Sequence, residues 1–309
     1  MAASALPACE LLACDWGTTN LRVWALDAAG AVTAQRDFPL GVSQLAAGEA
    51  ARRFHEEVRP ALGAERTPAI LCGMVGSNLG WAIAPYVDCP ASRADLAARL
   101  LAVEDPGGPV RIVPGVRSDG FNGRGDVMRG EETQLFGWLA SHPRYAQGRR
   151  LVCHPGTHAK WMLVEDGRLV GFVTAMTGEL FAVLGRHSVL RSEAPSDDMA
   201  AFDDGVEAAG DGDALAARLF TARARIVGQG APPQSASSYL SGLLIGADVA
   251  ATPRLLRAQA EEVILLGDSR LCGLYARALS ARGAKTTTFD GEAAAIAGLV
   301  ALHGMEMAQ

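Results

Sequence analysis

Two stretches of the sequence combine small residues and hydroxyl groups in a way that suits a phosphate ligand. The first is Asp15-Trp-Gly-Thr-Thr-Asn20, and the second is His154-Pro-Gly-Thr157. A glycine lets the backbone come close to a ligand, and hydroxyls with successive backbone N–H groups can face an anion. A carboxylate beside such a turn, such as Asp15, can hold the magnesium of a bound nucleotide through water. For the first stretch, the alternative is an ordinary hairpin turn without a ligand.

Apolar runs flank both stretches and must form the strands that position them. Leu11 to Cys14 is short and apolar, as expected of a buried strand, and apolar residues alternate along the run from Leu21 to Ala25. The run from Leu151 enters the second turn in the same way, and a hairpin turn at Glu165-Asp-Gly167 follows. The design of the first half therefore recurs in the second, which indicates two related domains facing one cleft.

The rest of the chain alternates between strand and helix patterns, which indicates an α/β protein with parallel strands in its C-terminal part. We expect further strands at 31–36, 67–72, 110–113, 168–174, 262–269 and 285–289. We expect helices at 48–62, 92–103, 127–138, 181–190, 197–209, 213–227, 235–251, 270–281 and 291–303, and a helix start at Thr177.

The composition is that of an ordinary globular protein. The chain has 309 residues, of which 49% are hydrophobic and 20% charged. Its net charge of -6 and the lack of a basic block argue against a nucleic-acid partner. No run reaches the roughly 18 to 20 apolar residues of a membrane span, and Met1 to Pro7 lacks a leader pattern. We therefore expect a cytoplasmic protein with no membrane partner.

Several other kinds of site are disfavoured. The six cysteines are scattered, mostly in apolar strands, and form no C-x-x-C pair, so we expect reduced thiols. Gly73 to Trp81 is rich in glycine but lacks the Gly-Lys-Ser/Thr that ends a Walker A loop. His154 and His158 are four residues apart, but the Pro-Gly between them prevents the helix that would align them on a zinc ion. The usual hydrolase and dinucleotide fingerprints are also missing.

The order of the motifs resembles that of the sugar kinase, Hsp70 and actin superfamily, and more closely that of the 2-dehydro-3-deoxygalactonokinase family. The resemblance covers nearly the whole chain. Its blocks are Asp15-Trp-Gly-Thr-Thr-Asn-Leu-Arg22, Ala69 to Trp81, Val127-Met-Arg-Gly-Glu-Glu-Thr-Gln134, Pro155-Gly-Thr-His-Ala-Lys-Trp161, Met176-Thr-Gly-Glu-Leu180 and Ser241-Gly-Leu-Leu-Ile-Gly-Ala247. Family members phosphorylate 2-dehydro-3-deoxygalactonate on its 6-hydroxyl with ATP, in galactonate breakdown.

The resemblance implies which residues bind ATP and Mg²⁺. Asp15 would hold the metal through water, the two turns would grip the phosphates, and the late Leu265-Leu-Gly-Asp268 would lie against the adenosine. Lys160 would reach a phosphate oxygen, although a solvated hairpin lysine is an alternative. The implied ATP-binding residues are Asp15, Gly17, Thr18, Thr19, Asn20, Gly156, Thr157, Lys160, Gly178, Gly267 and Asp268.

The general base stays open at this point. In many sugar kinases an acidic residue opens the helix before the second phosphate hairpin, and most relatives use Asp there. This chain offers Glu131 and Glu132, with Asp126 upstream. We favour Glu131, and keep Asp126, Glu132 and the lack of any general base as alternatives. The alternative without a catalytic role is that the two glutamates only supply negative charge at the start of a helix.

The implied substrate carries a carboxylate, which an arginine should bind through two parallel hydrogen bonds. Arg22 and Arg129 are the candidates, and the sequence does not rank them. In the loop that opens at Gly73, Ser77 and Asn78 would contact the oxo and hydroxyl groups, and Trp81 would form a wall.

The fold implied is the two-domain actin-like ATPase (ribonuclease H-like) fold, each domain a mixed sheet flanked by helices, with ATP in the interdomain cleft. We expect domains at 1–125 and 126–309, and leave open whether the last helix packs back on the N-terminal domain. We also leave open a homodimer. The rival functions are a kinase of another small sugar or sugar acid, and a nucleotide-driven binding protein like Hsp70 or actin.

Overall fold

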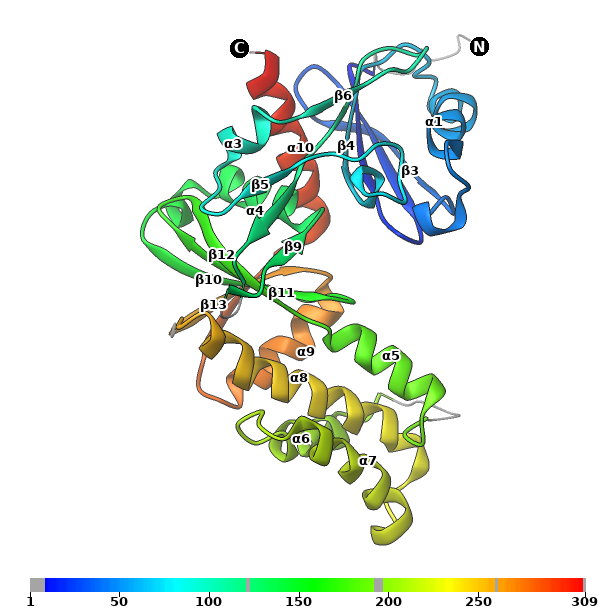
Figure 1. Cartoon of the computed structure of the whole chain (residues 1–309). Helices are drawn as coiled ribbons and strands as arrows, with labels where there is room; N and C mark the ends of the chain where they lie inside the picture. The colour runs from blue at the N-terminus through cyan, green and yellow to red at the C-terminus, as the bar shows by residue number, and fades with distance from the viewer. Residues whose placement is uncertain (1–8, 121–122, 192–196, 259–260, 308–309) are drawn as a thin grey trace, which may run out of the picture. The chain divides into compact units, whose positions relative to one another are not determined.

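The computed structural model describes residues 9–120, 123–191, 197–258 and 261–307 (Figure 1). Met1 to Pro7, considered above as a leader, lies outside the described residues. Contacts divide the chain into two compact units. Unit 1 consists of Met1–Ser118, Val127–Gln147 and Glu292–Gln309, and unit 2 consists of Asp119–Asp126 and Gly148–Gly291. The units are therefore discontinuous, unlike the expected division between residues 125 and 126.

Unit 1 contains a six-stranded mixed sheet in the order β3-β2-β1-β4-β7-β6. β1 and β2 form an antiparallel hairpin in which Asp15 lies opposite Arg22, and β4 runs parallel to β1. The strands are β1 (Leu11–Trp16), β2 (Leu21–Leu26), β3 (Val32–Phe38), β4 (Ala69–Gly73), β6 (Leu101–Val103) and β7 (Val110–Ile112).

Unit 2 contains a five-stranded mixed sheet in the order β12-β11-β10-β13-β14. β10 and β11 are antiparallel, and β13 runs parallel to β10. The strands are β10 (Arg149–His154), β11 (Ala159–Glu165), β12 (Arg168–Ala175), β13 (Glu262–Gly267) and β14 (Lys285–Asp290). A meander followed by parallel strands thus occurs in both sheets. This confirms the repeated design and the parallel C-terminal strands expected from the sequence.

The first expected helix of unit 1 is present, and the next two differ from expectation. Residues 49–61 form one helical stretch, made of α1 (Glu49–Arg53), a π turn (Phe54–Val58) and α2 (Arg59–Ala61). The helix expected over 92–103 is only α3 (Arg93–Ala97), because the chain turns there into β6. The helix expected from 127 is preceded by β9 (Asp126–Met128), which continues a small sheet with β5 (Tyr86–Asp88) and β8 (Gly115–Ser118).

Helices α4 (Glu131–Ser141) and α10 (Gly291–Met307) cross through glycines. A Cβ added at Gly137 would lie 1.9 Å from the carbonyl oxygen of Ala294, and one added at Gly298 would lie 2.1 Å from that of Thr133. The two backbones are therefore in direct contact, so a side chain at either glycine would force the helices apart. This contact explains why the last helix belongs with unit 1, although it follows the whole of unit 2 in the sequence.

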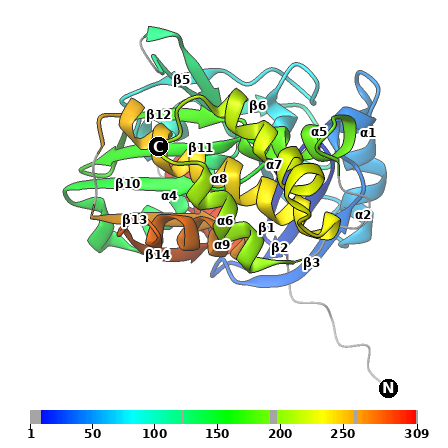
Figure 2. The same cartoon turned by 90° about the horizontal axis from the view of Figure 1, so that it is seen from below.

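Unit 2 has a helical layer built around α8. The helices are α5 (Thr177–His187), α6 (Met199–Ala208), α7 (Leu215–Gln229), α8 (Ala236–Leu255) and α9 (Ser269–Ser280). Figures 1 and 2 show α6 and α8 side by side. Glycines again allow the approach, since a Cβ at Gly242 would lie 1.9 Å from the carbonyl oxygen of Phe202. The helices around α8 form an apolar core of their own.

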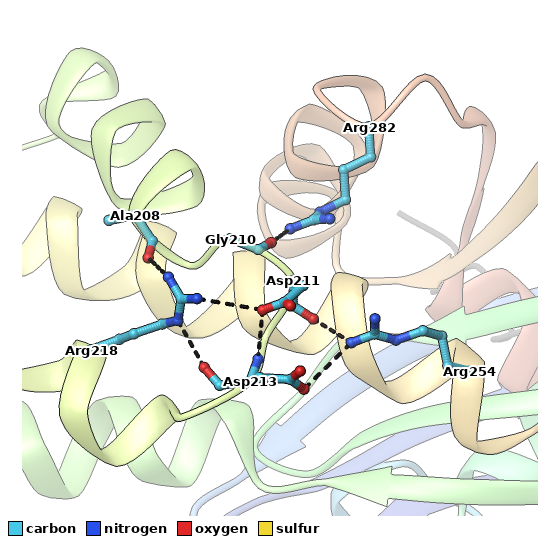
Figure 3. Close-up of polar contacts among 7 residues, drawn as sticks. All are labelled: Ala208, Gly210, Asp211, Asp213, Arg218, Arg254 and Arg282. Atoms are coloured by element: carbon cyan, nitrogen blue, oxygen red, sulfur yellow. Dashed lines mark hydrogen bonds and ion pairs between the residues drawn. The ribbon is translucent and has the colours of Figure 1, made fainter.

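Arginines hold the connection between α6 and α7 (Figure 3). Arg218 donates to the carbonyl oxygens of Ala208 and Asp213 at 2.9 and 2.7 Å. Arg254 and Arg282 donate to the carbonyl oxygens of Asp211 and Gly210 in the same turn. Arg254 and both aspartates are exposed and Arg218 is half-buried, so the ion pairs with Asp211 and Asp213 contribute little free energy and mainly fix the shape of the turn.

None of the helices in the described part of the chain is long and apolar enough to cross a membrane. All six cysteines lie in the described ranges and are free thiols, as expected from their scattered positions.

Candidate active site

The first phosphate-type turn, residues 17–20, closes the β1–β2 hairpin. The amide of Gly17 donates to the carbonyl oxygen of Asn20 at 2.9 Å, and the side chains of Thr18, Thr19 and Asn20 are exposed. The turn is held from behind by residues 41–43. The amide and hydroxyl of Ser43 both donate to the carbonyl oxygen of Thr18, and a Cβ at Gly41 would lie 2.1 Å from that oxygen. This support fixes the backbone while leaving the hydroxyls accessible.

The ends of β1 and β4 and the start of α4 meet at Gly73. A Cβ on Gly73 would lie 2.8 Å from the carbonyl oxygen of Trp16 and 3.1 Å from Oδ1 of Asp15. A Cβ on Gly130, which precedes α4, would lie 3.3 Å from the Cα of Gly73. Gly73 has φ 89°, a conformation that favours glycine. The sequence-predicted residues Asp15 and Gly73 are thus brought together with the acidic start of α4.

Asp15 is a perturbed carboxylate. Burial raises its pKa to about 6, the charge of Arg22 opposes that shift, and the carboxylates of Glu131 and Glu292 add to it. Both of these glutamates stand at helix starts, on α4 and α10. A cation near Asp15 would offset this local excess of negative charge.

The adjacent glutamates of α4 lie in different environments. Glu132 is fully buried, and its carboxylate accepts from the amide of Gly130 at 2.7 Å and from the hydroxyl of Thr133 at 3.0 Å. Burial, followed by the charge of Glu131, raises the pKa of Glu132 to about 8. Glu131 is only partly buried, and one of its oxygens accepts from the amide of Arg129 at 3.2 Å. At neutral pH Glu132 holds a proton and does not accept another.

Asp126, the third acidic candidate, is part of unit 2. Its two carboxylate oxygens accept from the amide and the hydroxyl of Thr174 on β12, at 2.6 and 2.8 Å. These bonds hold the carboxylate against the edge of the second sheet. This is the geometry of a side chain that fixes a loop.

Arg129 is a buried cation with two nitrogens that remain unpaired. Its guanidinium lies 4.5 Å from the ring centroid of Tyr86, and Nη2 donates to the carbonyl oxygen of Ala84 at 2.9 Å. Nε and Nη1 have no hydrogen-bond partner among the described residues. A Cβ on Gly76 would lie 2.8 Å from Nη1, so the guanidinium lies directly against the glycine-rich loop. A buried guanidinium with free donors is suited to an anionic ligand.

The glycine-rich loop itself contributes fewer free side chains than expected. The Ser77 hydroxyl donates to the carbonyl oxygen of Met74 at 2.7 Å and accepts from the amide of Leu79, so it stabilises the loop. The Trp81 ring packs against Phe54 with a centroid distance of 5.6 Å, as part of the core of unit 1. Asn78 is exposed. Arg22 is exposed as well and lies beside Asp15 in the hairpin.

In unit 2, the start of α5 supports the second phosphate-type turn. The amide of Glu179 donates to the carbonyl oxygen of Thr157 at 2.9 Å, and the Glu179 carboxylate pairs with the His158 ring. A Cβ on Gly178 would lie 2.5 Å from the carbonyl oxygen of Gly156. Gly178 therefore allows close contact between helix and turn, much as Gly41 does at the first turn. The positive end of the α5 dipole lies at this turn and favours an anion.

Lys160 is 4% exposed, so the alternative of a solvated lysine is wrong. Its Nζ donates to the carbonyl oxygen of His158 at 3.2 Å. At the end of β13, Gly267 approaches the same turn, since its Cβ would lie 3.6 Å from the carbonyl oxygen of Pro155. Asp268 caps α9 by accepting from the amide of Leu271 at 3.0 Å.

A cavity of about 620 Å³ opens beside the second turn. Of the residues that line this cavity, Gly156 and Gly178 were expected from the sequence. Most of the other lining residues, on α5, α6, α8 and α9, were not. The lining residues include Thr177, Phe181, Phe202, Ser238, Ser241, Leu244, Ile245, Arg270, Leu271, Leu274 and Tyr275. The block Ser241 to Ala247 was noticed only as a family signature, because an apolar helix carries no sign of which face lines a cavity.

Within the described residues, no group of three or more His, Cys, Asp or Glu side chains could hold a metal ion directly.

Five strands of the first sheet, β3-β2-β1-β4-β7, match the order and directions of β12-β11-β10-β13-β14 in the second, and each sheet carries a phosphate-type turn. This is the fold of a two-domain sugar kinase. The family model described as 2-keto-3-deoxy-galactonokinase matches residues 15–302, and the chain belongs to that family.

Named relatives agree with this assignment. The chain is 38% identical over 299 residues to a Rhizobium meliloti (strain 1021) protein named "Probable 2-dehydro-3-deoxygalactonokinase DgoK1", covering 94% of this chain and 95% of the relative. It is 36% identical to the 2-dehydro-3-deoxygalactonokinase of Escherichia coli (strain K12), covering 93% and 95%. A crystal structure of a candidate 2-dehydro-3-deoxygalactonokinase from Sinorhizobium meliloti superposes with a TM-score of 0.83 at 37% identity, covering 94% of this chain and 97% of that one.

Proposed function

We propose that this protein transfers the γ-phosphoryl group of ATP to the 6-hydroxyl of 2-dehydro-3-deoxy-D-galactonate, giving 2-dehydro-3-deoxy-6-phospho-D-galactonate in D-galactonate catabolism. The observation that carries the proposal is the buried guanidinium of Arg129, in a chain of this family. Its Nε and Nη1 have no partner among the described residues, and Nη1 lies against Gly76 of the glycine-rich loop. Such a group suits the carboxylate of a sugar acid, which neutral sugars lack. Because ATP is supplied in the cytoplasm, we place the reaction there.

Unit 1 carries the groups for the acceptor and for the metal. Arg129 binds the substrate carboxylate, and Asn78 reaches a hydroxyl from the exposed part of the loop. Arg22 has another role: it lies opposite Asp15 in the hairpin, and its positive charge stabilises the Asp15 carboxylate. Ser77 and Trp81 shape the loop, since the contacts of both side chains lie within it or in the core.

Asp15 is the residue that would hold Mg²⁺, through water. The fit rests on the raised pKa of this carboxylate beside two further glutamates, because a cation would relieve that repulsion. Mg²⁺ usually keeps several of its own water ligands, so one carboxylate can hold it through water. When bound with ATP, the ion neutralises charge on the transferring phosphoryl group.

Glu131 is the proposed general base. Phosphoryl transfer depends mostly on positioning and charge stabilisation, with an acidic residue accepting the proton of the attacking hydroxyl. Glu131 is only partly buried, whereas Glu132 is fully buried and protonated at neutral pH, and both oxygens of Asp126 are bonded to Thr174. The 6-hydroxyl proton therefore passes to a Glu131 oxygen as the O–P bond forms, and ADP leaves.

Unit 2 carries the groups for the nucleotide. The turn at Gly156 and Thr157 contacts the phosphates, with Lys160 supplying positive charge from β11 next to it. The apolar walls of the 620 Å³ cavity suit the adenosine, and Gly267 lies at the end of β13 in contact with the turn. Asp268 caps the N-terminus of α9 and so helps to position Arg270, the first α9 residue that lines the cavity.

The acceptor is tested by ADP release from the purified protein with Mg²⁺. The panel holds 2-dehydro-3-deoxy-D-galactonate, its gluconate epimer, galactonate and common neutral sugars. We expect turnover confined to the 2-dehydro-3-deoxy acids. Turnover with a neutral sugar would contradict the role of Arg129, and ATP hydrolysis without any acceptor would favour a nucleotide-driven binding protein.

A further inference from the structure

Asp248 is a buried carboxylate on α8 of unit 2. Oδ1 accepts from Nε1 of Trp161 at 2.9 Å and from the Thr252 hydroxyl at 2.7 Å. Oδ2 accepts from the Thr177 hydroxyl at 2.8 Å and from the Tyr275 hydroxyl at 2.7 Å. Four neutral donors thus use the acceptor capacity of a single carboxylate.

The donors come from the elements that surround the candidate nucleotide cavity. Thr177 is the first residue of α5 and immediately precedes Gly178, which packs against the second phosphate-type turn. Tyr275 is on α9, and Trp161 is on β11, which leaves that turn. Thr177 and Tyr275 both line the cavity, whereas Thr252 lies on α8 itself, one turn beyond Asp248, and does not line it.

A carboxylate is costly to bury, so its presence needs a reason beyond packing. The four hydrogen bonds favour the charged form and offset part of the desolvation. An amide or an apolar residue of similar size would avoid the buried charge, but neither could accept from all four donors. The carboxylate of Asp248 thus links α5, α9 and β11 to α8.

We propose that Asp248 is a positioning residue for nucleotide binding, which fixes the start of α5 under the phosphate turn and the Tyr275 wall of the cavity at the same time. This inference rests on the proposed use of the cavity and turn for ATP. Asp248 itself touches no ligand and acts through Thr177 and Tyr275. Its loss changes the binding of ATP, and leaves the binding of the sugar acid in unit 1 unchanged.

The test compares variants that each remove one of the hydrogen bonds to the Asp248 carboxylate. Tyr275→Phe keeps the ring in the wall but removes one bond, and Thr177→Val does the same at the start of α5. Thr252→Val removes a matched bond outside the cavity. We expect the KM for ATP to rise about tenfold in the first two variants, as for a lost hydrogen bond to a charged group. The KM for the sugar acid stays within about twofold in all three variants, as does the KM for ATP in Thr252→Val.

Asp248→Asn should raise the KM for ATP more than any single donor variant, because it disturbs all four bonds. Thermal unfolding of every variant separates lost folding from lost positioning. A rise in the KM for ATP that is as large in Thr252→Val as in Tyr275→Phe would overturn the inference, since the network would then act only through stability. Unchanged ATP kinetics in Tyr275→Phe and Thr177→Val would also overturn it.

A cavity-filling variant, Leu244→Trp, separates this inference from the proposed function. Direct titration with ATP should show that it loses ATP binding. If Leu244→Trp binds ATP normally, the cavity is not the nucleotide site, and the functional assignment fails together with the inference. If Leu244→Trp loses ATP while the Thr177 and Tyr275 variants bind it normally, only the inference fails.

Discussion

Glu131 and Glu132 are neighbours in the sequence, yet only Glu132 is sealed in the interior, where its carboxylate accepts from the amide of Gly130. Gly130 has φ 112° and is followed directly by α4. The helix therefore begins with one glutamate turned inward and one that is only partly buried. Burial raises the pKa of Asp15, and the charge of Glu131 adds to that shift. This arrangement separates two groups that the sequence could not distinguish.

Glu131→Gln should abolish most of the turnover. We expect kcat to fall by about 10²- to 10⁴-fold, the usual contribution of a general base, while the KM for ATP changes little. Asp126→Asn is the comparison, and should cost less than tenfold in kcat because Asp126 is bonded to Thr174. Steady-state kinetics at saturating ATP decides between them, and a larger loss in the Asp126 variant would reverse the assignment.

Glu132→Gln should change how stability depends on pH. The pKa of Glu132 is about 8 in the folded protein against an ordinary value of 4.5, so folding favours its protonated form. Its contribution to stability is complete below pH 4.5 and is lost as pH rises through 8, with a slope of up to about 1.4 kcal/mol per pH unit.

Denaturant unfolding at pH 5 and pH 8 measures this effect. The wild-type protein should lose stability between the two pH values, and the Gln variant should lose clearly less. Glu65→Gln, a change at an exposed glutamate, should retain the wild-type dependence. Parallel curves for the wild-type and Glu132→Gln proteins would show that Glu132 is ionised when folded.

Arg129→Lys should weaken the binding of the sugar acid. Lysine lacks the planar pair of donors and the stacking on Tyr86, so we expect the KM for the acid to rise about 10- to 100-fold with the KM for ATP unchanged. Arg22→Lys, at the other candidate, should raise it less than threefold. If the Arg22 variant shows the larger change, the carboxylate is bound from the β1–β2 hairpin.

Gly178→Ala should impair ATP binding, because the added Cβ would lie 2.5 Å from the carbonyl oxygen of Gly156. The turn or the helix must move, and we expect the KM for ATP to rise at least tenfold. Gly185→Ala, on the same helix, meets no atom within 4 Å and should leave the KM unchanged while stabilising α5 by about 0.5 to 1 kcal/mol. Equal kinetics for both variants would show that the turn tolerates displacement.

The sequence was sufficient to predict the two turns and the strands around them, because an apolar run, a glycine and hydroxyls are local signals. It also predicted the repeat, which the strand orders confirm. It failed where a partner is distant. Thr174 binds Asp126 across 48 residues, and nothing near Asp126 indicates this.

Other features of the structure could not be predicted from local sequence patterns. Asp248 is the only acidic residue of α8, which is a sign of a buried polar network, but its partners can only be identified from the three-dimensional structure. Gly41 follows β3 and belongs to no recognisable sequence motif. Its close approach to Thr18 arises because the chain after β3 folds back against the β1–β2 turn. The end of α3 at Ala97 was missed because the next strand, β6, is only three residues long.

Phosphorus and carbon NMR of the reaction products tests the central claim most directly. The purified protein is incubated with ATP, Mg²⁺ and 2-dehydro-3-deoxy-D-galactonate, and the products are followed until ATP is consumed. We expect one phosphate ester on C6 of the sugar acid, formed in equal amount with ADP. Inorganic phosphate in place of the ester, or an ester at another carbon, would contradict it.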